Sequence, residues 1–72
     1  MWQPTLRQFE VFLAVAKAGS FRAAAEAMHL SQPAISQHLA EMEHDLGTRL
    51  FDRLGRKVAL TEAGRVLAPI RK

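Results

Sequence analysis

The sequence contains no cysteine and no long uninterrupted apolar run. Without cysteine the chain can form neither a disulfide framework nor a cysteine zinc site. No apolar stretch reaches the roughly 20 residues needed to cross a bilayer. The N-terminus also lacks a basic region followed by an apolar core, which would mark a secretory signal. We therefore expect a cytoplasmic protein with no membrane contact.

The length and composition indicate one small folded domain. Seventy-two residues make one domain at most, and a chain this short buries only about 60% of its unfolded surface. Hydrophobic residues nevertheless make up 49% of the sequence and include four phenylalanines and one tryptophan. This is too apolar for a disordered segment.

Positive charge is concentrated in the last third of the chain. Residues 1–48 carry three basic and five acidic groups, a net charge of −2, whereas residues 49–72 carry seven basic and two acidic groups, a net charge of +5. A basic segment after a near-neutral body indicates a polyanionic partner. A solvated surface that needs charge for solubility explains the same distribution, so charge alone leaves both interpretations open.

Three helices are predicted in the first 47 residues. The first, about 5–18, begins at a capping box formed by Thr5 and Gln8 and ends before Gly19. The second is capped by Ser20 and ends near His29. The apolar face of the first helix is expected to comprise Leu6, Phe9, Phe12, Leu13 and Ala16. That of the second is expected to comprise Phe21, Ala24, Ala25 and Met28.

The third helix, 31–46, is the stretch that the rest of the chain is expected to present. Ser31 can cap it and Pro33 falls in its first turn. Its apolar stripe is Ile35, Leu39, Met42 and Leu46, and its opposite face carries Pro33, Gln37, Ala40 and His44, flanked by Ser36. A helix with one buried side and short, neutral, hydrogen-bonding side chains at its N-terminal end suits a DNA major groove. The tight connection to the second helix predicts a helix-turn-helix, although spacing alone also fits an ordinary helical hairpin.

Residues 50–60 are predicted to form a two-stranded hairpin. Strands over 51–53 and 58–60 flank a turn over 54–57, and the hairpin should pack on the helices through Phe51, Val58 and Leu60. Its basic side chains, Arg53, Arg56 and Lys57, can reach phosphates or a minor groove. Charges on such a hairpin also prevent edge-to-edge pairing, which is the alternative explanation.

The last helix starts at Thr61. Its apolar stripe is Ala63, Val66, Leu67 and Ile70, and nothing else in the chain obviously covers it. Pro69 must either bend this helix or end it by Ala68. The stripe predicts contact with a partner. One alternative is therefore a helical protein–protein module that docks through residues 63–70 and has no nucleic-acid role.

No catalytic or metal-binding constellation is recognisable. His29, His38 and His44 include no pair spaced i, i+4 on one helix face, and no carboxylate or thiol completes a ligand set. Neither a nucleophile–base pair nor paired carboxylates are present. We expect no enzyme activity, no metal and no cofactor.

Taken together, the motifs resemble the N-terminal DNA-binding domain of LysR-type transcriptional regulators. The resemblance is carried by AGSF at 18–21, the alanines at 23–25, SQPAIS at 31–36, LG at 46–47, LFDR at 50–53 and LTEAG at 60–64. It implies a mainly α winged helix-turn-helix over 4–61, with the helix-turn-helix at about 21–40 and the wing at about 50–60. It also implies a three-helix core, a two-stranded β wing and the start of a dimerising linker helix at 62–72.

The same resemblance implies a sequence-specific regulator that binds double-stranded DNA as a homodimer or higher oligomer. Small-molecule effectors would act only through a C-terminal domain that this sequence does not include. The residues expected to read bases are Gln32, Pro33, Ser36 and Gln37. Those expected at the backbone or minor groove are Ser20, Arg22, Ser31, Arg53, Arg56 and Lys57, and those expected at the dimer interface are Ala63, Val66, Leu67 and Ile70.

The chain departs from the family pattern on the third helix. The family often has a basic residue where this chain has Gln37, and often basic residues at the positions of Ala40 and Glu41. The third helix therefore has no lysine or arginine, and phosphate attraction is left mainly to the wing. Because glutamine pairs best with adenine, Gln32 and Gln37 favour half-sites that contain A·T pairs.

Overall fold

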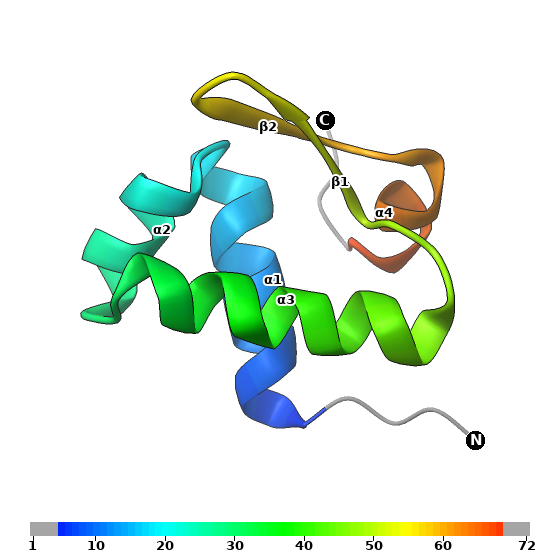
Figure 1. The fold of residues 1–72 in the computed structure, drawn as a ribbon, viewed down its shortest axis with the longest axis horizontal. Helices are drawn as coiled ribbons and strands as arrows, with labels where there is room; N and C mark the ends of the chain where they lie inside the picture. The colour runs from blue at the N-terminus through cyan, green and yellow to red at the C-terminus, as the bar shows by residue number, and fades with distance from the viewer. Residues whose placement is uncertain (1–4, 69–72) are drawn as a thin grey trace.

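The computed structural model describes residues 5–68 of the chain. Its elements are α1 (Leu6–Ala18), α2 (Phe21–Met28), α3 (Gln32–Leu46), β1 (Phe51–Leu54), β2 (Lys57–Leu60) and α4 (Glu62–Leu67). In Figure 1, α3 crosses α1, α2 lies at one end of this pair, and the β1–β2 hairpin runs along the edge of the helical body. The predicted mainly α fold, with a three-helix core and a two-stranded wing, is confirmed.

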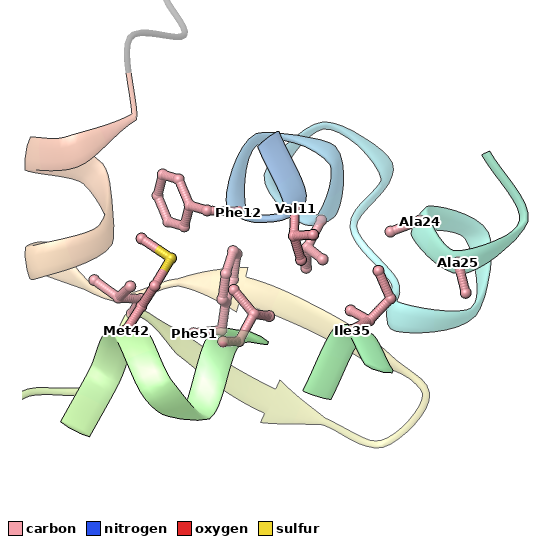
Figure 2. Close-up of a cluster of buried hydrophobic side chains, with 10 residues drawn as sticks. Val11, Phe12, Ala24, Ala25, Ile35, Met42 and Phe51 are labelled. Atoms are coloured by element: carbon pink, nitrogen blue, oxygen red, sulfur yellow. The ribbon is translucent and has the colours of Figure 1, made fainter. Parts of the chain in front are cut away.

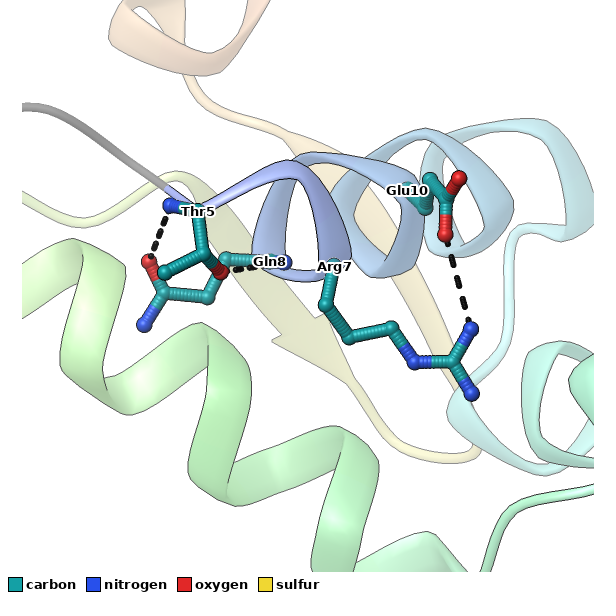
Figure 3. A network of polar contacts seen from close by, with 4 residues as sticks. All are labelled: Thr5, Arg7, Gln8 and Glu10. Carbon is teal, nitrogen blue, oxygen red and sulfur yellow. Dashed lines mark hydrogen bonds and ion pairs between the residues drawn. The ribbon is translucent and has the colours of Figure 1, made fainter.

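The predicted helix starts are observed, and each has a side-chain cap. The Thr5 hydroxyl accepts from the Gln8 backbone N–H at 3.0 Å, and Gln8 Oε1 accepts from the Thr5 N–H at 3.3 Å (Figure 3). Ser20 and Ser31 cap α2 and α3 in the same way, each accepting from a backbone N–H three residues later. Because Ser31 has the extended conformation of a cap, α3 begins at Gln32, one residue later than predicted.

Two sharp turns separate the three helices. Gly19 ends α1 in the left-handed conformation, with φ 72°, and accepts a hydrogen bond from the wing. His29 ends α2 with φ 59°, an uncommon conformation for a residue with a side chain. Only Leu30 and the cap Ser31 then precede α3. The chain therefore changes direction sharply within a few residues, as a helix-turn-helix requires.

The core is formed by apolar side chains from the first three helices, from β1 and from Leu50 just before it, several of which are seen in Figure 2. The buried residues are Val11, Phe12, Val15, Ala24, Ala25, Ile35, Leu39, Met42, Leu50 and Phe51. The predicted stripes of α2 and α3 supply most of the helical members of this cluster. The rings of Phe12 and Phe51 lie with centroids 5.4 Å apart. This contact anchors the first strand of the wing to the middle of α1.

The predicted apolar face of α1 was partly wrong. Leu6 is 75% exposed, whereas Val11 and Val15, which the prediction omitted, are fully buried. Leu6 is the first residue of α1, whereas Val11 and Val15 are spaced i, i+4 further along the helix. Contacts with α2, α3 and β2 together decide which side of α1 is covered. A helix with apolar residues around most of its circumference does not specify that choice by its own periodicity.

The strands of the wing are longer than predicted, and the wing is hydrogen-bonded to the helical body. Its strands pair antiparallel from Phe51 opposite Leu60 to Leu54 opposite Lys57, so each strand has one residue more than expected. The turn is accordingly shorter than the predicted 54–57. The Val58 N–H donates to the Gly19 carbonyl at 3.0 Å, which ties β2 to the α1–α2 turn. The hairpin is therefore held against the start of α2.

The start of α4 folds back onto the core. The Thr61 N–H donates to the Leu50 carbonyl at 3.0 Å, and its hydroxyl donates to the Arg49 carbonyl at 2.6 Å. Gly64 is buried against Leu50, where a β-carbon would lie 2.3 Å from the Leu50 carbonyl oxygen. These contacts explain why the chain carries a threonine and a glycine three residues apart after the wing.

The expectation that nothing covers the α4 stripe was wrong for two of its members. Ala63 and Leu67 pack against the chain's own core, while Val66 is 82% exposed. The helix ends at Leu67, and Ala68 is extended with ψ 125°, as the residue before a proline prefers. Of the two alternatives for the last helix, an end by Ala68 is the one observed. Pro69 and Ile70 lie outside the described residues.

Candidate nucleic-acid interface

The starts of α2 and α3 and the wing enclose a groove of about 510 Å³, which we call the arginine groove. Its lining residues are Ser20, Phe21, Arg22, Gln32, Arg53, Gly55, Arg56 and Val58. The hydrogen bond between Val58 and Gly19 and the short turn between α2 and α3 bring these three elements together. Half of the residues predicted to contact DNA meet here, and every charged residue in the lining is an arginine. The groove therefore favours an anion.

Arg53 lies over an aromatic ring at the side of this groove. Its guanidinium carbon is 4.6 Å from the centroid of Phe21, which is the geometry of a cation–π contact. Phe21 is half-buried and directly follows the cap of α2. Sequence reasoning placed Phe21 only in the core, because its spacing fits the apolar stripe. The contact limits where the wing arginine can point while leaving its N–H groups available.

The two capping serines keep a free donor. Each hydroxyl oxygen accepts a helix N–H, with distances of 2.9 Å at Ser20 and 3.2 Å at Ser31. A serine hydroxyl can accept and donate at once, so both retain an O–H for a phosphate oxygen. Arg22 lies 3.5 Å from Glu26, but both side chains are mostly exposed. Such a pair contributes little in water, and the arginine can exchange it for another anion.

The residues predicted to read bases lie along the first two turns of α3. Gln32 and Pro33 are exposed at its start, and Ser36 is half-buried. Gln37 is exposed and donates from Nε2 to Glu41 at 3.5 Å. Gln32 lines the arginine groove, whereas Gln37 lines a second groove of about 340 Å³ between α1 and α3. The predicted base-reading set is thus spread along one helix and is not gathered in a single pocket.

Two further basic residues lie on the wing. Arg56 is in the turn and lines the arginine groove, while Lys57 is the first residue of β2 and is exposed.

Across residues 5–68, no set of three or more histidine, aspartate or glutamate side chains is grouped so that it could hold a metal ion. Within the same range, no helix has the length and apolar character to span a bilayer.

Comparison with known proteins places this geometry in context. The family model described as "Bacterial regulatory helix-turn-helix protein, lysR family" matches residues 6–65. A curated relative from Azotobacter vinelandii, an uncharacterized HTH-type transcriptional regulator, is 56% identical over 64 residues. The match covers 89% of this chain and 44% of that protein, so the chain spans less than half the length of this relative.

Solved structures have the same arrangement. A Corynebacterium glutamicum OxyR C206S mutant is similar with a TM-score of 0.90 and 41% identity, over 94% of this chain and 21% of that one. The CbnR DNA-binding domain in complex with DNA is similar with a TM-score of 0.83 and 44% identity. That match covers 86% of this chain and 71% of the CbnR domain.

Proposed function

The chain belongs to the LysR family of bacterial regulatory helix-turn-helix proteins, and from that premise we propose that it reads double-stranded DNA with α3 in the major groove. The family is one of transcription regulators rather than enzymes. In this proposal the wing lies against phosphates and the flanking minor groove. Gln32, Pro33, Ser36 and Gln37 face base edges.

The arginine groove is the observation that carries the proposal. It joins the start of α3, where base-reading side chains of a helix-turn-helix lie, to three arginines from α2 and the wing. Arg22, Arg53 and Arg56 supply the phosphate attraction that the uncharged α3 lacks. The hydroxyls of Ser20 and Ser31 add neutral contacts to the same backbone. The CbnR domain, which shares this fold, forms a complex with DNA.

We further propose that two copies bind together, with α4 at their interface. Val66 is the apolar α4 side chain that the core leaves exposed. Ala63 and Leu67 would support it from the buried side of the helix, whereas Ile70, the fourth residue of the predicted interface, lies outside the described residues. Two such modules would address half-sites one or more helical turns apart. Small-molecule effectors would act through a further domain of a longer regulator.

The proposal is tested by selecting duplexes from random DNA with the purified chain and then measuring affinity over a range of salt concentrations. We expect one enriched motif, rich in A·T pairs. If three arginines neutralise phosphates, log K should fall with log salt with a slope of about −3 for each chain. Absence of any enriched motif, with no salt-dependent binding, would contradict the proposal. It would favour the helical protein–protein module instead.

A further inference from the structure

Glu41 connects a proposed base-reading side chain to the first helix. It lies one turn after Gln37 on α3, and its Oε2 accepts from Gln37 Nε2 at 3.5 Å. Its Oε1 accepts from Gln8 Nε2 of α1 at 2.9 Å. All three residues line the second groove, between α1 and α3. Each carboxylate oxygen of Glu41 therefore faces one side-chain amide.

The buried residue, Gln8, determines which atoms donate and which accept in this series of hydrogen bonds. Gln8 is only 9% exposed, and its Oε1 accepts from the Thr5 N–H in the capping box (Figure 3). Its Nε2 must then face Glu41. An ionised carboxylate can only accept hydrogen bonds, so Gln37 must also turn Nε2 toward Glu41. At 3.5 Å this second contact is long, and it biases the amide orientation of Gln37 without locking it.

This orientation decides what Gln37 can offer to a base. One N–H is used by Glu41, which leaves the Oε1 acceptor and one N–H donor. Adenine presents the complementary pattern in the major groove, a donor at N6 beside an acceptor at N7, whereas guanine presents two acceptors. We propose that Glu41 is a positioning residue that makes Gln37 prefer adenine over guanine. The inference rests on the proposed function, because Gln37 must face a base.

The substitution Glu41→Gln tests this directly, because glutamine has one acceptor and one donor where glutamate has two acceptors. Burial makes an unpaired N–H of Gln8 costly, so the new Oε1 should keep that bond. The new Nε2 then faces Gln37, which must turn its own Oε1 toward it. Gln37 now presents both N–H groups outward, which matches guanine.

The experiment starts from duplexes selected by the wild-type chain. Gln37→Ala identifies the base pair that Gln37 reads, because preference there should disappear. Affinities are then measured for four duplexes that differ only at this pair. We expect the wild type to prefer adenine over guanine by about tenfold or more. Glu41→Gln should lower this ratio by about tenfold or reverse it, and Glu41→Ala should lower it by a smaller factor, because an unrestrained glutamine still pairs best with adenine.

Asp45→Asn is the matched control. Asp45 is exposed one turn further along α3, and the substitution removes the same charge without changing the partner of Gln37. It should alter affinity for all four duplexes alike and leave the adenine preference intact. Thermal unfolding of each variant is recorded in parallel. Glu41→Gln keeps a partner for Gln8 and is the decisive variant if Glu41→Ala is destabilised.

Three results would overturn the inference, and they differ in what else they contradict. If both Glu41 variants keep the wild-type adenine preference, Glu41 does not orient Gln37. If Gln37→Ala changes no base preference although the wild type selects a motif, Gln37 is not a base reader and DNA binding stands. If the wild type selects no motif, the proposed function fails and the inference fails with it.

Discussion

At the scale of single residues, the proposed interface depends on side chains that contact two partners at once. Phe21 packs against the core with part of its ring and carries the guanidinium of Arg53 on its face. Ser20 caps α2 and still has a hydrogen to donate. The contacts that stabilise the fold at these residues therefore also position the atoms proposed to face DNA. Substitutions at these positions should therefore be judged by binding and by stability together.

Arg53→Ala should weaken binding to all duplexes by a similar factor. Because Arg53 is proposed to contact phosphate and not a base edge, the salt dependence should lose about one unit of slope while the selected motif stays the same. Phe21→Leu leaves the charge of Arg53 in place and keeps much of the apolar volume of Phe21, but it removes the aromatic ring under the guanidinium. It should cause a smaller loss in the same direction, of about 0.5–1 kcal/mol, as an exposed cation–π contact contributes.

Affinity measurements at several salt concentrations check both expectations. Arg7→Ala is a suitable control, since Arg7 is on the first turn of α1, pairs with Glu10 at 3.4 Å (Figure 3) and does not line the arginine groove. A change in the preferred motif on Arg53→Ala would contradict the assigned backbone role.

At the scale of elements, short hydrogen-bonded and close-packed junctions position the wing. The Glu43 carboxylate of α3 accepts from the Leu50 N–H at 2.7 Å and from the Phe51 N–H at 3.4 Å. On the other side of the wing, Thr61 and Gly64 bring α4 against Leu50. The wing thus enters from the end of α3 and leaves into the start of α4 through contacts that meet at residues 49–51. Its direction relative to α3 follows from these contacts.

Gly64→Ala should destabilise the domain. Its new β-carbon would lie 2.3 Å from the Leu50 carbonyl oxygen and 2.8 Å from a Leu60 methyl carbon, and the carbonyl cannot move away without stretching its bond from Thr61. Overpacking of this kind costs about 1–3 kcal/mol. In a domain this small, each kcal/mol lowers Tm by roughly 4–8 °C.

Thermal or urea unfolding measures the effect of Gly64→Ala. Arg65→Ala is the control at the next, exposed position of α4 and should change stability by no more than about 0.5 kcal/mol. If Gly64→Ala were as stable as wild type, the close approach of α4 to Leu50 would not be present in solution.

At the scale of the whole molecule, the arginine groove and the proposed dimer contact lie on different elements. The arginine groove is formed by α2, α3 and the wing, while Val66 is exposed on α4. A helix-turn-helix dimer requires this separation, because the same surface cannot bind DNA and a second protomer. Leu54, 62% exposed on the wing, and Leu6, 75% exposed at the start of α1, are two further apolar side chains in contact with solvent. The proposed dimer uses α4 alone.

Val66→Asp should shift the association equilibrium toward monomer. A charge placed in an apolar interface is left desolvated and unpaired, so sedimentation of the variant should show less dimer than wild type at the same concentration. Leu54→Asp makes the same chemical change on the wing and should leave the association state unchanged. A wild type that is monomeric at every concentration, or a Val66→Asp variant that dimerises as well as wild type, would contradict the proposed interface.

The sequence alone was sufficient to predict the local features of this protein. The caps at Thr5, Ser20 and Ser31, the stop at Gly19 and the hairpin were all predictable, because each depends on interactions between residues close in the chain. The motif order was sufficient to identify the family, which the match over residues 6–65 confirms.

Only the tertiary structure decided which of several compatible surfaces each element uses. The buried side of α1 was only partly predicted, because the surrounding elements and not its own period select Val11 and Val15 over Leu6. The tertiary structure also decided which residues of the α4 stripe pack against the core. The same holds for the contact of Arg53 with Phe21 and for the link from Gln8 through Glu41 to Gln37, which join residues up to 33 positions apart. Contacts over such separations depend on how the helices cross, which no local pattern in the chain specifies.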